Sequence, residues 1–345
     1  MLAGCVTDDP DDDLDSGATP TSTNGETATP GSDGTSDPAT SGDDASGGGS
    51  MEGTTGDEPM DSDDSTGDSE SDSDSEGEST GEPTDPGPDL RELGPHAVDT
   101  SAGTAQLSTG CSMGYDLRTP AAGGDPPVVV LAHGFQGNRG TMAGWAEHWA
   151  SWGVTVITPD LCHATIFDSD HAQNGADLQA LVDELGLGSV VYAGYSAGGL
   201  ASVIATAGDA EALALLGLDM VDADDLGAMA APGVSVPAFD ILGEPSMCNT
   251  TNNGLAVFQA AGGQVLRVTE ADHCDFQSPA DFLCGLTCNG TNAQFDDETI
   301  AAAVRGLSTA VVLWQTGLEP TGAQWWTPGS PYYEELAGLG ILQQP

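Results

Sequence analysis

Six short runs of apolar residues, many of them β-branched, recur between residues 128 and 269 and alternate with stretches that favour helices. Each run is continuously apolar, which is typical of strands buried on both faces of a parallel sheet. Repeated strand–helix units predict an α/β domain with a doubly wound, mostly parallel sheet. The expected strands are 128–132, 154–158, 189–193, 212–218, 236–242 and 264–269, and the expected helices are 140–151, 174–185, 197–207, 252–261 and 296–316.

The composition changes abruptly near residue 90. From residue 6 to residue 89 the chain consists almost entirely of Asp, Glu, Ser, Thr, Gly and Pro, without a basic or aromatic residue. Such a segment buries too little apolar area to offset the entropy lost on ordering it. We therefore expect a disordered acidic linker over 6–90, followed by one folded domain over 91–345, a length typical of a single domain.

The charge of the chain excludes one class of partner. Its formal net charge is −50, and its five basic residues are all arginines. Nucleic acid is not an expected partner, because binding phosphates requires positive charge. The acidity has two interpretations, which are adaptation to salty water, where screening relieves self-repulsion, and simple compositional bias.

The first five residues suggest how the protein is held in place. Leu-Ala-Gly-Cys at residues 2–5 resembles the lipobox at which a bacterial lipoprotein precursor is cut before its cysteine is lipidated. The basic and hydrophobic regions that precede a lipobox are missing, so we expect the natural start to lie upstream. We expect residues 1–5 to be the remnant of that signal and Cys5 to carry a lipid anchor. The protein would then lie at the bacterial cell envelope or outside the cell, tethered to a membrane by 6–90. The alternative is a chance match of four residues.

Six further cysteines form an even set, namely Cys111, Cys162, Cys248, Cys274, Cys284 and Cys288. An even number suits an oxidising compartment and up to three disulfides, whose pairing the sequence leaves open. The pattern Cys284-Gly-Leu-Thr-Cys288 has no second Cys or His pair at zinc-finger spacing, so no metal site is expected.

The sequence around Ser196 carries the first sign of chemistry. The expected strand 189–193 leads into Gly194-Tyr195-Ser196-Ala197-Gly198, and an Ala-rich helix follows. This order of strand, sharp turn and helix is what a nucleophile elbow requires, and the glycines permit the strained turn. The structural alternative is a serine that only caps a helix. We expect Ser196 to be a nucleophile.

A serine nucleophile needs a base and an acid. His273 follows the last expected strand and is the expected base, because the base lies late in the chain in this arrangement. Two carboxylates stand at strand ends between the serine and the histidine, Asp219 and Glu244, and either satisfies the order Ser, acid, His. Asp222 and Asp240 are poorer candidates, because Asp222 lies further into a loop and Asp240 lies inside a strand.

The negative charge that develops on the substrate oxygen needs two backbone N–H donors. One is expected from Ala197, the residue after the nucleophile, and the other from Phe135 in His133-Gly134-Phe135-Gln136-Gly137, directly after the strand 128–132. The structural alternative is an ordinary turn at a strand end.

These motifs together resemble the α/β-hydrolases that include chlorophyllases, platelet-activating-factor acetylhydrolases, and dienelactone-hydrolase-like or polyester-hydrolase enzymes. The resemblance covers roughly residues 128–314. Gly217-Leu218-Asp219 matches the acid-bearing segment of chlorophyllase-like members, and Asp272-His273-Cys274-Asp275-Phe276 is similar to their histidine segment. The resemblance therefore implies an α/β-hydrolase fold and favours Asp219 as the acid, with Glu244 as the alternative. Ser246 stands where polyester hydrolases carry their Asp, which argues against that subgroup.

We accordingly expect a serine hydrolase that cleaves carboxylic esters through an acyl-enzyme on Ser196. Its expected substrate is a small-molecule or lipid-like ester, and the mechanism requires no metal or organic cofactor. Two alternatives remain open. One is an amidase or thioesterase that uses the same triad, and the other is a non-catalytic surface lipoprotein that binds a ligand with a hydrolase fold.

Overall fold

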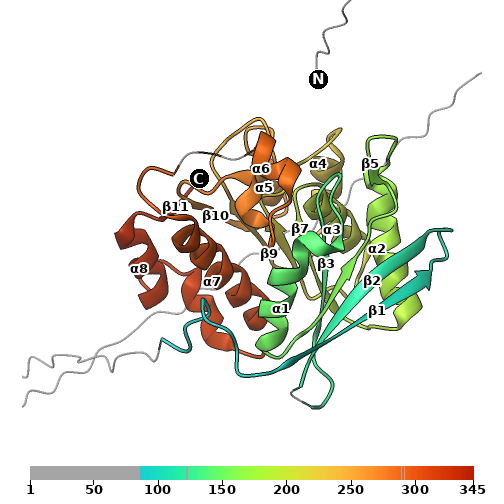
Figure 1. Cartoon of the computed structure of the whole chain (residues 1–345), viewed down its shortest axis with the longest axis horizontal. Helices are drawn as coiled ribbons and strands as arrows, with labels where there is room; N and C mark the ends of the chain where they lie inside the picture. Colours follow the sequence, from blue (N-terminus) through green and yellow to red (C-terminus); the bar gives the residue numbers. More distant parts are fainter. Residues whose placement is uncertain (1–85, 122, 289, 291) are drawn as a thin grey trace, which may run out of the picture. The chain divides into compact units, whose positions relative to one another are not determined.

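A nine-stranded mixed sheet forms the centre of the protein (Figure 1). The computed structural model describes residues 86–345 except 122, 289 and 291, so the expected lipidation site Cys5 and most of the expected linker lie outside the described residues. The strand order is β1-β2-β4-β3-β7-β8-β9-β10-β11. The strands are β1 (Val98–Gln106), β2 (Ser112–Pro120), β3 (Val128–Ala132), β4 (Thr155–Pro159), β7 (Val190–Tyr195), β8 (Ala214–Leu218), β9 (Ala238–Leu242), β10 (Gln264–Val268) and β11 (Leu342–Gln343).

The six central strands are parallel and coincide with the six predicted apolar runs. In β3, Val129 and Val130 point to opposite faces of the sheet, and both are fully buried. A strand buried on both faces can carry apolar residues at every position, and this produces the continuous runs seen in the sequence. The predicted α/β class with a mostly parallel sheet is therefore confirmed.

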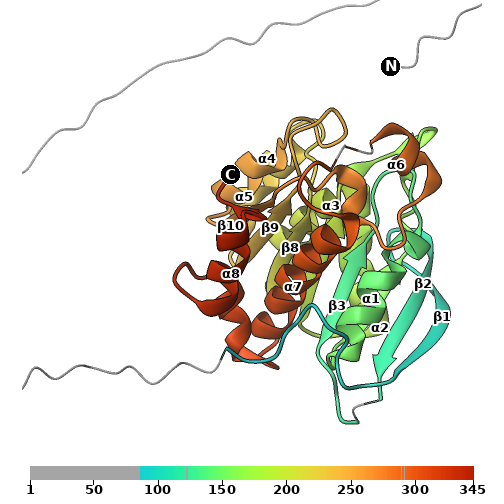
Figure 2. The same cartoon turned by 60° about the vertical axis from the view of Figure 1, so that its left-hand side comes forward.

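Helices cover both faces of the sheet, as Figure 2 shows from the side. α1, α7 and α8 pack with one set of alternate strand residues, whereas α2, α3 and α5 pack with the other set. All five predicted helices are present, with ends shifted by up to three residues. The α-helices are α1 (Ala143–Ser151), α2 (His171–Leu185), α3 (Ala197–Gly208), α4 (Leu226–Ala230), α5 (Gly254–Ala260), α6 (Phe282–Thr287), α7 (Asp297–Gln315) and α8 (Pro331–Leu339).

Shorter elements complete the described chain. A two-stranded hairpin stands apart from the main sheet, and four 3₁₀ turns join larger elements. These elements are β5 (Ala164–Thr165), β6 (Asp168–Ser169), η1 (Arg139–Met142), η2 (Ala231–Gly233), η3 (His273–Phe276) and η4 (Pro320–Trp325). None of the helices in the described part of the chain is both long and apolar enough to cross a membrane.

The large aromatic residues pack inside the domain. Trp149 and Trp325 are almost fully buried, and Trp325 stacks on Tyr332 with ring centroids 4.3 Å apart. Leu90 is also buried in the core, and its carbonyl oxygen accepts a hydrogen bond from His148 Nε2 at 3.0 Å. Packing of the domain thus begins at least one residue before the expected boundary at residue 91, because Leu90 has an apolar side chain to bury.

The connections of the sheet place its functional edge. From β3 the chain crosses to β4 on one side and then returns to β7 on the other side of β3. The loops that follow β3 and β7 therefore leave the sheet in opposite directions at their carboxyl ends. In open α/β sheets this switch point is where ligands bind. The loop after β3 begins at His133, and the turn after β7 holds Ser196.

Candidate active site

Ser196 occupies a strained turn between β7 and α3. Its backbone angles are φ 53° and ψ −124°, outside the regions that non-glycine residues ordinarily adopt. The flanking glycines make this turn sterically feasible. A Cβ on Gly194 would collide with the backbone of Gly198, and a Cβ on Gly198 would collide with the His133 carbonyl oxygen. The predicted elbow geometry is therefore present, with Ser196 at the amino end of α3.

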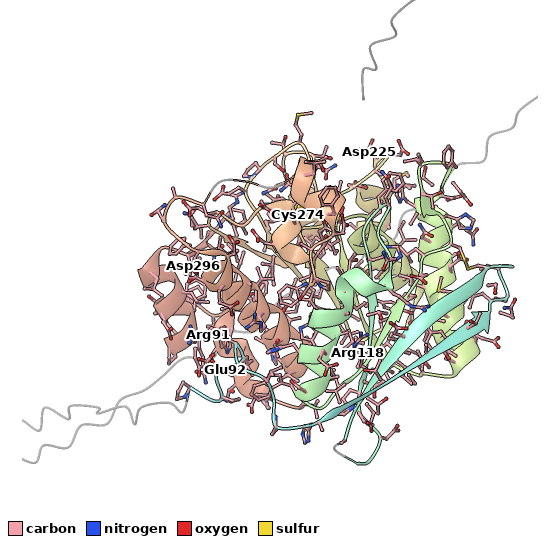
Figure 3. The ribbon with its side chains drawn as sticks, in the orientation of Figure 1. Arg91, Glu92, Arg118, Asp225, Cys274 and Asp296 are labelled. Atoms are coloured by element: carbon pink, nitrogen blue, oxygen red, sulfur yellow. A yellow bond between two sulfur atoms is a disulfide. The ribbon has the colours of Figure 1, made fainter. Side chains whose placement is uncertain are left out.

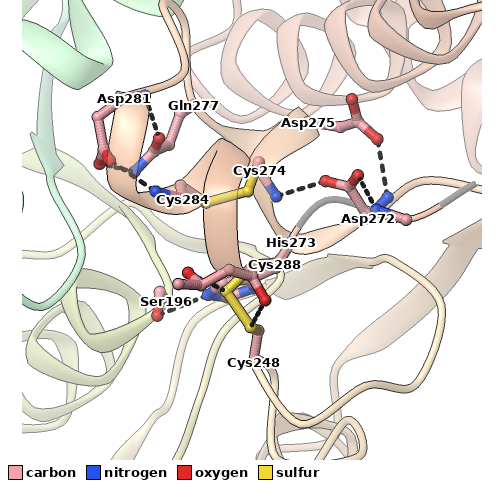
Figure 4. The surroundings of a disulfide bond; sticks show 12 residues. Ser196, Cys248, Asp272, His273, Cys274, Asp275, Gln277, Asp281, Cys284 and Cys288 are labelled. Atoms are coloured by element: carbon pink, nitrogen blue, oxygen red, sulfur yellow. Dashed lines mark hydrogen bonds between the residues drawn. A yellow bond between two sulfur atoms is a disulfide. The ribbon is translucent and has the colours of Figure 1, made fainter.

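His273 lies directly beside the serine. It begins the turn η3 after β10, and its Nε2 is 3.0 Å from Ser196 Oγ (Figure 4). Its other ring nitrogen, Nδ1, is 2.6 Å from Asp219 Oδ2. The Tyr195 ring packs against the imidazole with ring centroids 4.8 Å apart, which restricts the ring's rotation. An imidazole held in this way donates from Nδ1 to the aspartate and accepts the serine proton at Nε2.

Asp219 is the carboxylate that the structure brings to the imidazole. It follows β8, is fully buried and has a φ of 49°. Its Oδ1 accepts a hydrogen bond from the Gly243 N–H at 2.9 Å, in addition to the contact of Oδ2 with His273. The donors on both oxygens hold the carboxylate in position to accept a hydrogen bond from the imidazole.

The other carboxylates have different partners. Glu244 Oε1 accepts the Glu270 N–H at 3.1 Å, and the described hydrogen bonds of Glu244 do not include one to His273. Asp222 accepts the N–H groups of Gly227 and Ala228 at the start of α4. Asp240 is fully buried in β9, and burial together with the charge of Asp219 holds the pKa of its carboxyl well above the usual range. The structure therefore brings Asp219, and not Glu244, within hydrogen-bond distance of His273.

Phe135 and Ala197 present backbone N–H groups beside the serine. Within the described residues, neither N–H donates a hydrogen bond to another residue. The two segments are close, because a Cβ added to Gly134 would lie 3.1 Å from Ser196 Cβ. Two backbone N–H donors without an acceptor in the segments next to a nucleophile are what an oxyanion hole requires.

His133 shapes the loop that carries Phe135. Its Nδ1 donates to the Gly134 carbonyl oxygen at 2.8 Å, and its Nε2 accepts the Leu161 N–H at 3.0 Å. Burial lowers the pKa of this histidine, so its ring stays neutral and can make both contacts. His133 thus joins the loop after β3 to the loop after β4.

Asn249 is a site residue that the sequence does not reveal. It is fully buried, and its Nδ2 lies 3.3 Å from Asp219 Oδ1 and 3.1 Å from Asp219 Oδ2. The same nitrogen donates to the Glu244 carbonyl oxygen at 2.8 Å. Asn249 lies in an irregular loop without periodicity, and its place beside Cys248 is the one local hint that this loop is held in position.

Three disulfides connect the six cysteines, which agrees with the expected upper number. Cys111 pairs with Cys162, which joins the residue before β2 to the loop after β4. The other two bonds, Cys248–Cys288 and Cys274–Cys284, lie around the His273 segment (Figure 4). The first of these holds the loop of Asn249, and the second joins the residue after His273 to α6. The loop that carries His273 and the loop that carries Asn249 are therefore each cross-linked to α6 or to the residue at its end.

One group of side chains in the described part of the chain has the spacing of a metal site, namely Cys111, Cys162 and Asp177. Both sulfurs are joined in a disulfide and are not thiolates, which are the form of cysteine that binds metals. This group joins the start of β2 and the loop after β4 to α2, and it does not include Ser196, His273 or Asp219.

Comparisons with known proteins return no relative: neither a family model nor a curated protein matches this chain.

Proposed function

We propose that this protein is a serine hydrolase with an α/β-hydrolase fold that cleaves carboxylic esters through an acyl-enzyme on Ser196. The observation that carries the proposal is the chain of two short contacts, 3.0 Å from Ser196 Oγ to His273 Nε2 and 2.6 Å from His273 Nδ1 to Asp219 Oδ2. The series of contacts runs from Asp219 through His273 to Ser196, which lies in a strained, glycine-flanked turn. This is the arrangement that activates a hydroxyl group as a nucleophile.

In the first half of the reaction, Ser196 Oγ attacks the ester carbonyl carbon while its proton passes to His273 Nε2. Asp219 accepts the Nδ1–H and stabilises the imidazolium that forms. The carbonyl oxygen becomes negatively charged and is held by the N–H groups of Phe135 and Ala197. Collapse of this intermediate breaks the bond to the alcohol oxygen, which leaves with the proton from His273.

In the second half, water attacks the acyl-serine ester. His273 takes a proton from that water, the new tetrahedral intermediate again places its charge between the two N–H groups, and the carboxylic acid leaves as Ser196 recovers its proton. Every proton moves between the substrate, water, Ser196 and His273.

The location of the enzyme is part of the proposal. We propose that it works at the bacterial cell envelope or outside the cell, held by a lipid on Cys5. Three disulfides in the described residues support an oxidising compartment, because such bonds persist mainly in secreted and envelope proteins.

Replacement of the nucleophile tests the proposed activity. Ser196→Ala should lower the hydrolysis of p-nitrophenyl acetate by about 10⁴-fold or more, since no other hydroxyl group contacts His273 in the described site. Ser101→Ala, an exposed serine on β1, is the matched control and should hydrolyse the ester like the parent protein. Turnover that survives in Ser196→Ala would refute the assignment. Parallel assays with p-nitroacetanilide and a thioacetate establish whether amides or thioesters are also cleaved.

A further inference from the structure

Large apolar side chains that are exposed to solvent gather at the edge of the sheet that holds Ser196. Ten such residues are exposed in the described part of the chain, and six of them lie on four segments around the elbow. We call these six the apolar rim: Phe135, Ile166, Phe167, Met247, Phe282 and Leu286. Two of them are almost fully exposed, Phe167 at 93% and Met247 at 97%.

One side of the apolar rim is joined to the loop after β3, which carries Phe135. Phe135 follows Gly134, whose added Cβ would lie 3.1 Å from Ser196 Cβ. The next residue, Gln136, donates its N–H to the Ala164 carbonyl oxygen at 2.7 Å. Ala164 begins the β5–β6 hairpin, and the turn of that hairpin carries Ile166 and Phe167. These three apolar residues therefore stand on one side of the nucleophile.

The other side of the apolar rim is formed by α6 and the loop after β9. The Tyr195 hydroxyl lies 3.6 Å from Cys284 Sγ, which places α6 next to the elbow. Phe282 and Leu286 project from this helix into solvent. The disulfide from Cys248 to Cys288 joins the end of α6 to the residue that follows Met247. Figure 1 shows α6 and the β5 hairpin at the same end of the molecule.

The charges around the apolar rim are negative. Exposed carboxylates of the same edge include Asp168, Asp170 and Asp225, and Figure 3 shows Asp225 at this end, whereas Arg91 and Arg118 lie nearer the opposite end. The loops that follow the parallel strands contain one arginine, Arg139, which forms ion pairs with Asp116 at 3.0 Å and Asp160 at 3.2 Å. The edge thus combines apolar side chains with carboxylates and no unpaired guanidinium group.

We propose that the apolar rim docks this protein on the surface of a water-insoluble, uncharged ester, so that Ser196 cleaves ester bonds at that surface. The proposal rests on the hydrolase activity proposed above. Soluble proteins rarely expose clustered apolar side chains without a partner, and insertion of these side chains into an ester phase removes them from water. The acidic surroundings repel an anionic lipid surface, a second copy of this acidic chain and the carboxylate product.

Flotation of the full chain with triolein droplets tests docking without relying on turnover. Ser196→Ala protein should float with the droplets, and the further changes Phe167→Ser and Met247→Ser together should weaken this binding about tenfold. The matched control is Leu339→Ser, because Leu339 is an exposed apolar residue on α8, away from the rim. It should leave the binding as it is. Doping the droplets with phosphatidylglycerol should weaken binding at low salt.

Activity gives the second measurement. With Ser196 present, the ratio of the rate on a tributyrin emulsion to the rate on dissolved p-nitrophenyl acetate should fall about tenfold in the Phe167→Ser, Met247→Ser protein and stay constant in Leu339→Ser. The proposal is overturned if the Ser196→Ala protein does not float with the droplets. It is also overturned if Leu339→Ser weakens binding as much as the two rim changes do. It is equally overturned if sedimentation velocity shows a dimer that becomes a monomer in the Phe167→Ser, Met247→Ser protein. The apolar rim would then bind a second copy of this chain. Failure of the proposed hydrolysis would appear separately, as absent turnover of the dissolved ester.

Discussion

At the scale of single residues, the geometry of the site depends on glycines at which an added Cβ atom would collide with the backbone. Ser196 and Asp219 both have positive φ values, which cost free energy in residues with a side chain. Ser196 is held there because Gly194 and Gly198 leave room for the turn, and the side chain of Asp219 is held by contacts with Gly243, Asn249 and His273. The strain at both residues is consistent with a functional turn, since tertiary packing maintains a conformation that local preference opposes.

Asn249 should act as a positioning residue for the acid. Asn249→Ala removes the donor that reaches both Asp219 oxygens and should lower kcat/KM for p-nitrophenyl acetate about tenfold. With one donor fewer, Asp219 attracts the proton on His273 more strongly, so the acid limb of the pH profile should move to higher pH.

The matched control for this change lies in the same loop. Asn253 forms similar hydrogen bonds with the backbone of Asp222 and does not contact Asp219. Asn253→Ala should therefore leave the acid limb in place, even if it lowers the stability of the loop. An unshifted acid limb in Asn249→Ala would contradict the positioning role.

At the scale of elements, the sequence predicts the strands that are buried on both faces of the sheet. It does not predict a strand that forms mainly by pairing with a neighbouring strand. The six central strands were predictable because every position of a strand such as β3 faces a helix layer. β1 was not, because most of its residues are exposed and its sequence VDTSAGTAQ has no apolar alternation. It forms by pairing along its whole length with the next strand, β2, and its own residue pattern does not reveal this pairing.

The site divides in the same way. The positions of Ser196, His273, Phe135 and Ala197 near one another could be predicted because each follows a recognisable strand in the expected order, and their catalytic roles stay predictions. Asn249 and the disulfide partners could not, because their positions depend on how irregular loops after different strands meet in space. Chain order alone leaves Asp219 and Glu244 open, since both stand at strand ends, and the resemblance and the contact with His273 both favour Asp219.

The turn η3 contains a carboxyl group with a raised pKa, that of Asp275. Burial raises the pKa of Asp275 to about 7, although its Oδ2 accepts the Asp272 N–H at 2.7 Å. Between about pH 4 and 7 the folded protein therefore binds a proton that the unfolded chain has released, and stability from this group is lost as pH rises through that range. Because the carboxyl is partly exposed, we expect a loss of about 1 to 2 kcal/mol.

Asp275→Asn isolates this contribution, because the amide oxygen still accepts the Asp272 N–H but cannot ionise. Urea unfolding at pH 5 and pH 8 should show a smaller decrease in the free energy of unfolding for Asp275→Asn than for the parent protein. Other titrating groups act in both proteins and cancel in the comparison. Equal pH dependence in the two proteins would show that Asp275 ionises in the folded state as it does in the unfolded chain.

At the scale of the whole molecule, charge and apolar surface are distributed unequally. The chain carries 55 acidic and 5 basic residues, and its described arginines largely form ion pairs with carboxylates. The remaining carboxylates repel one another in the folded state, whereas the proposed docking edge adds exposed apolar side chains. Screening by salt would lower the cost of the repulsion, and contact with an apolar phase would lower the cost of the exposed apolar side chains.

Self-repulsion predicts a dependence on salt. At pH 7, raising NaCl from 0.05 M to 1 M shortens the screening length and should stabilise the protein by on the order of 1 kcal/mol, which corresponds to a midpoint increase of about 2–4 °C. At pH 4, where many carboxylates are protonated, the same salt should change the midpoint much less. A pH-independent effect of salt would indicate that charge repulsion is not its source.

The central claim is that Ser196 is an activated nucleophile, and a fluorophosphonate probe tests it most directly. Such a probe forms a covalent bond only with a serine whose proton a neighbouring base removes. Mass spectrometry of the labelled full chain should find one adduct, on the peptide that contains Ser196, and His273→Ala should abolish it. Absence of labelling in the parent protein, or an adduct on a different serine, would contradict the account.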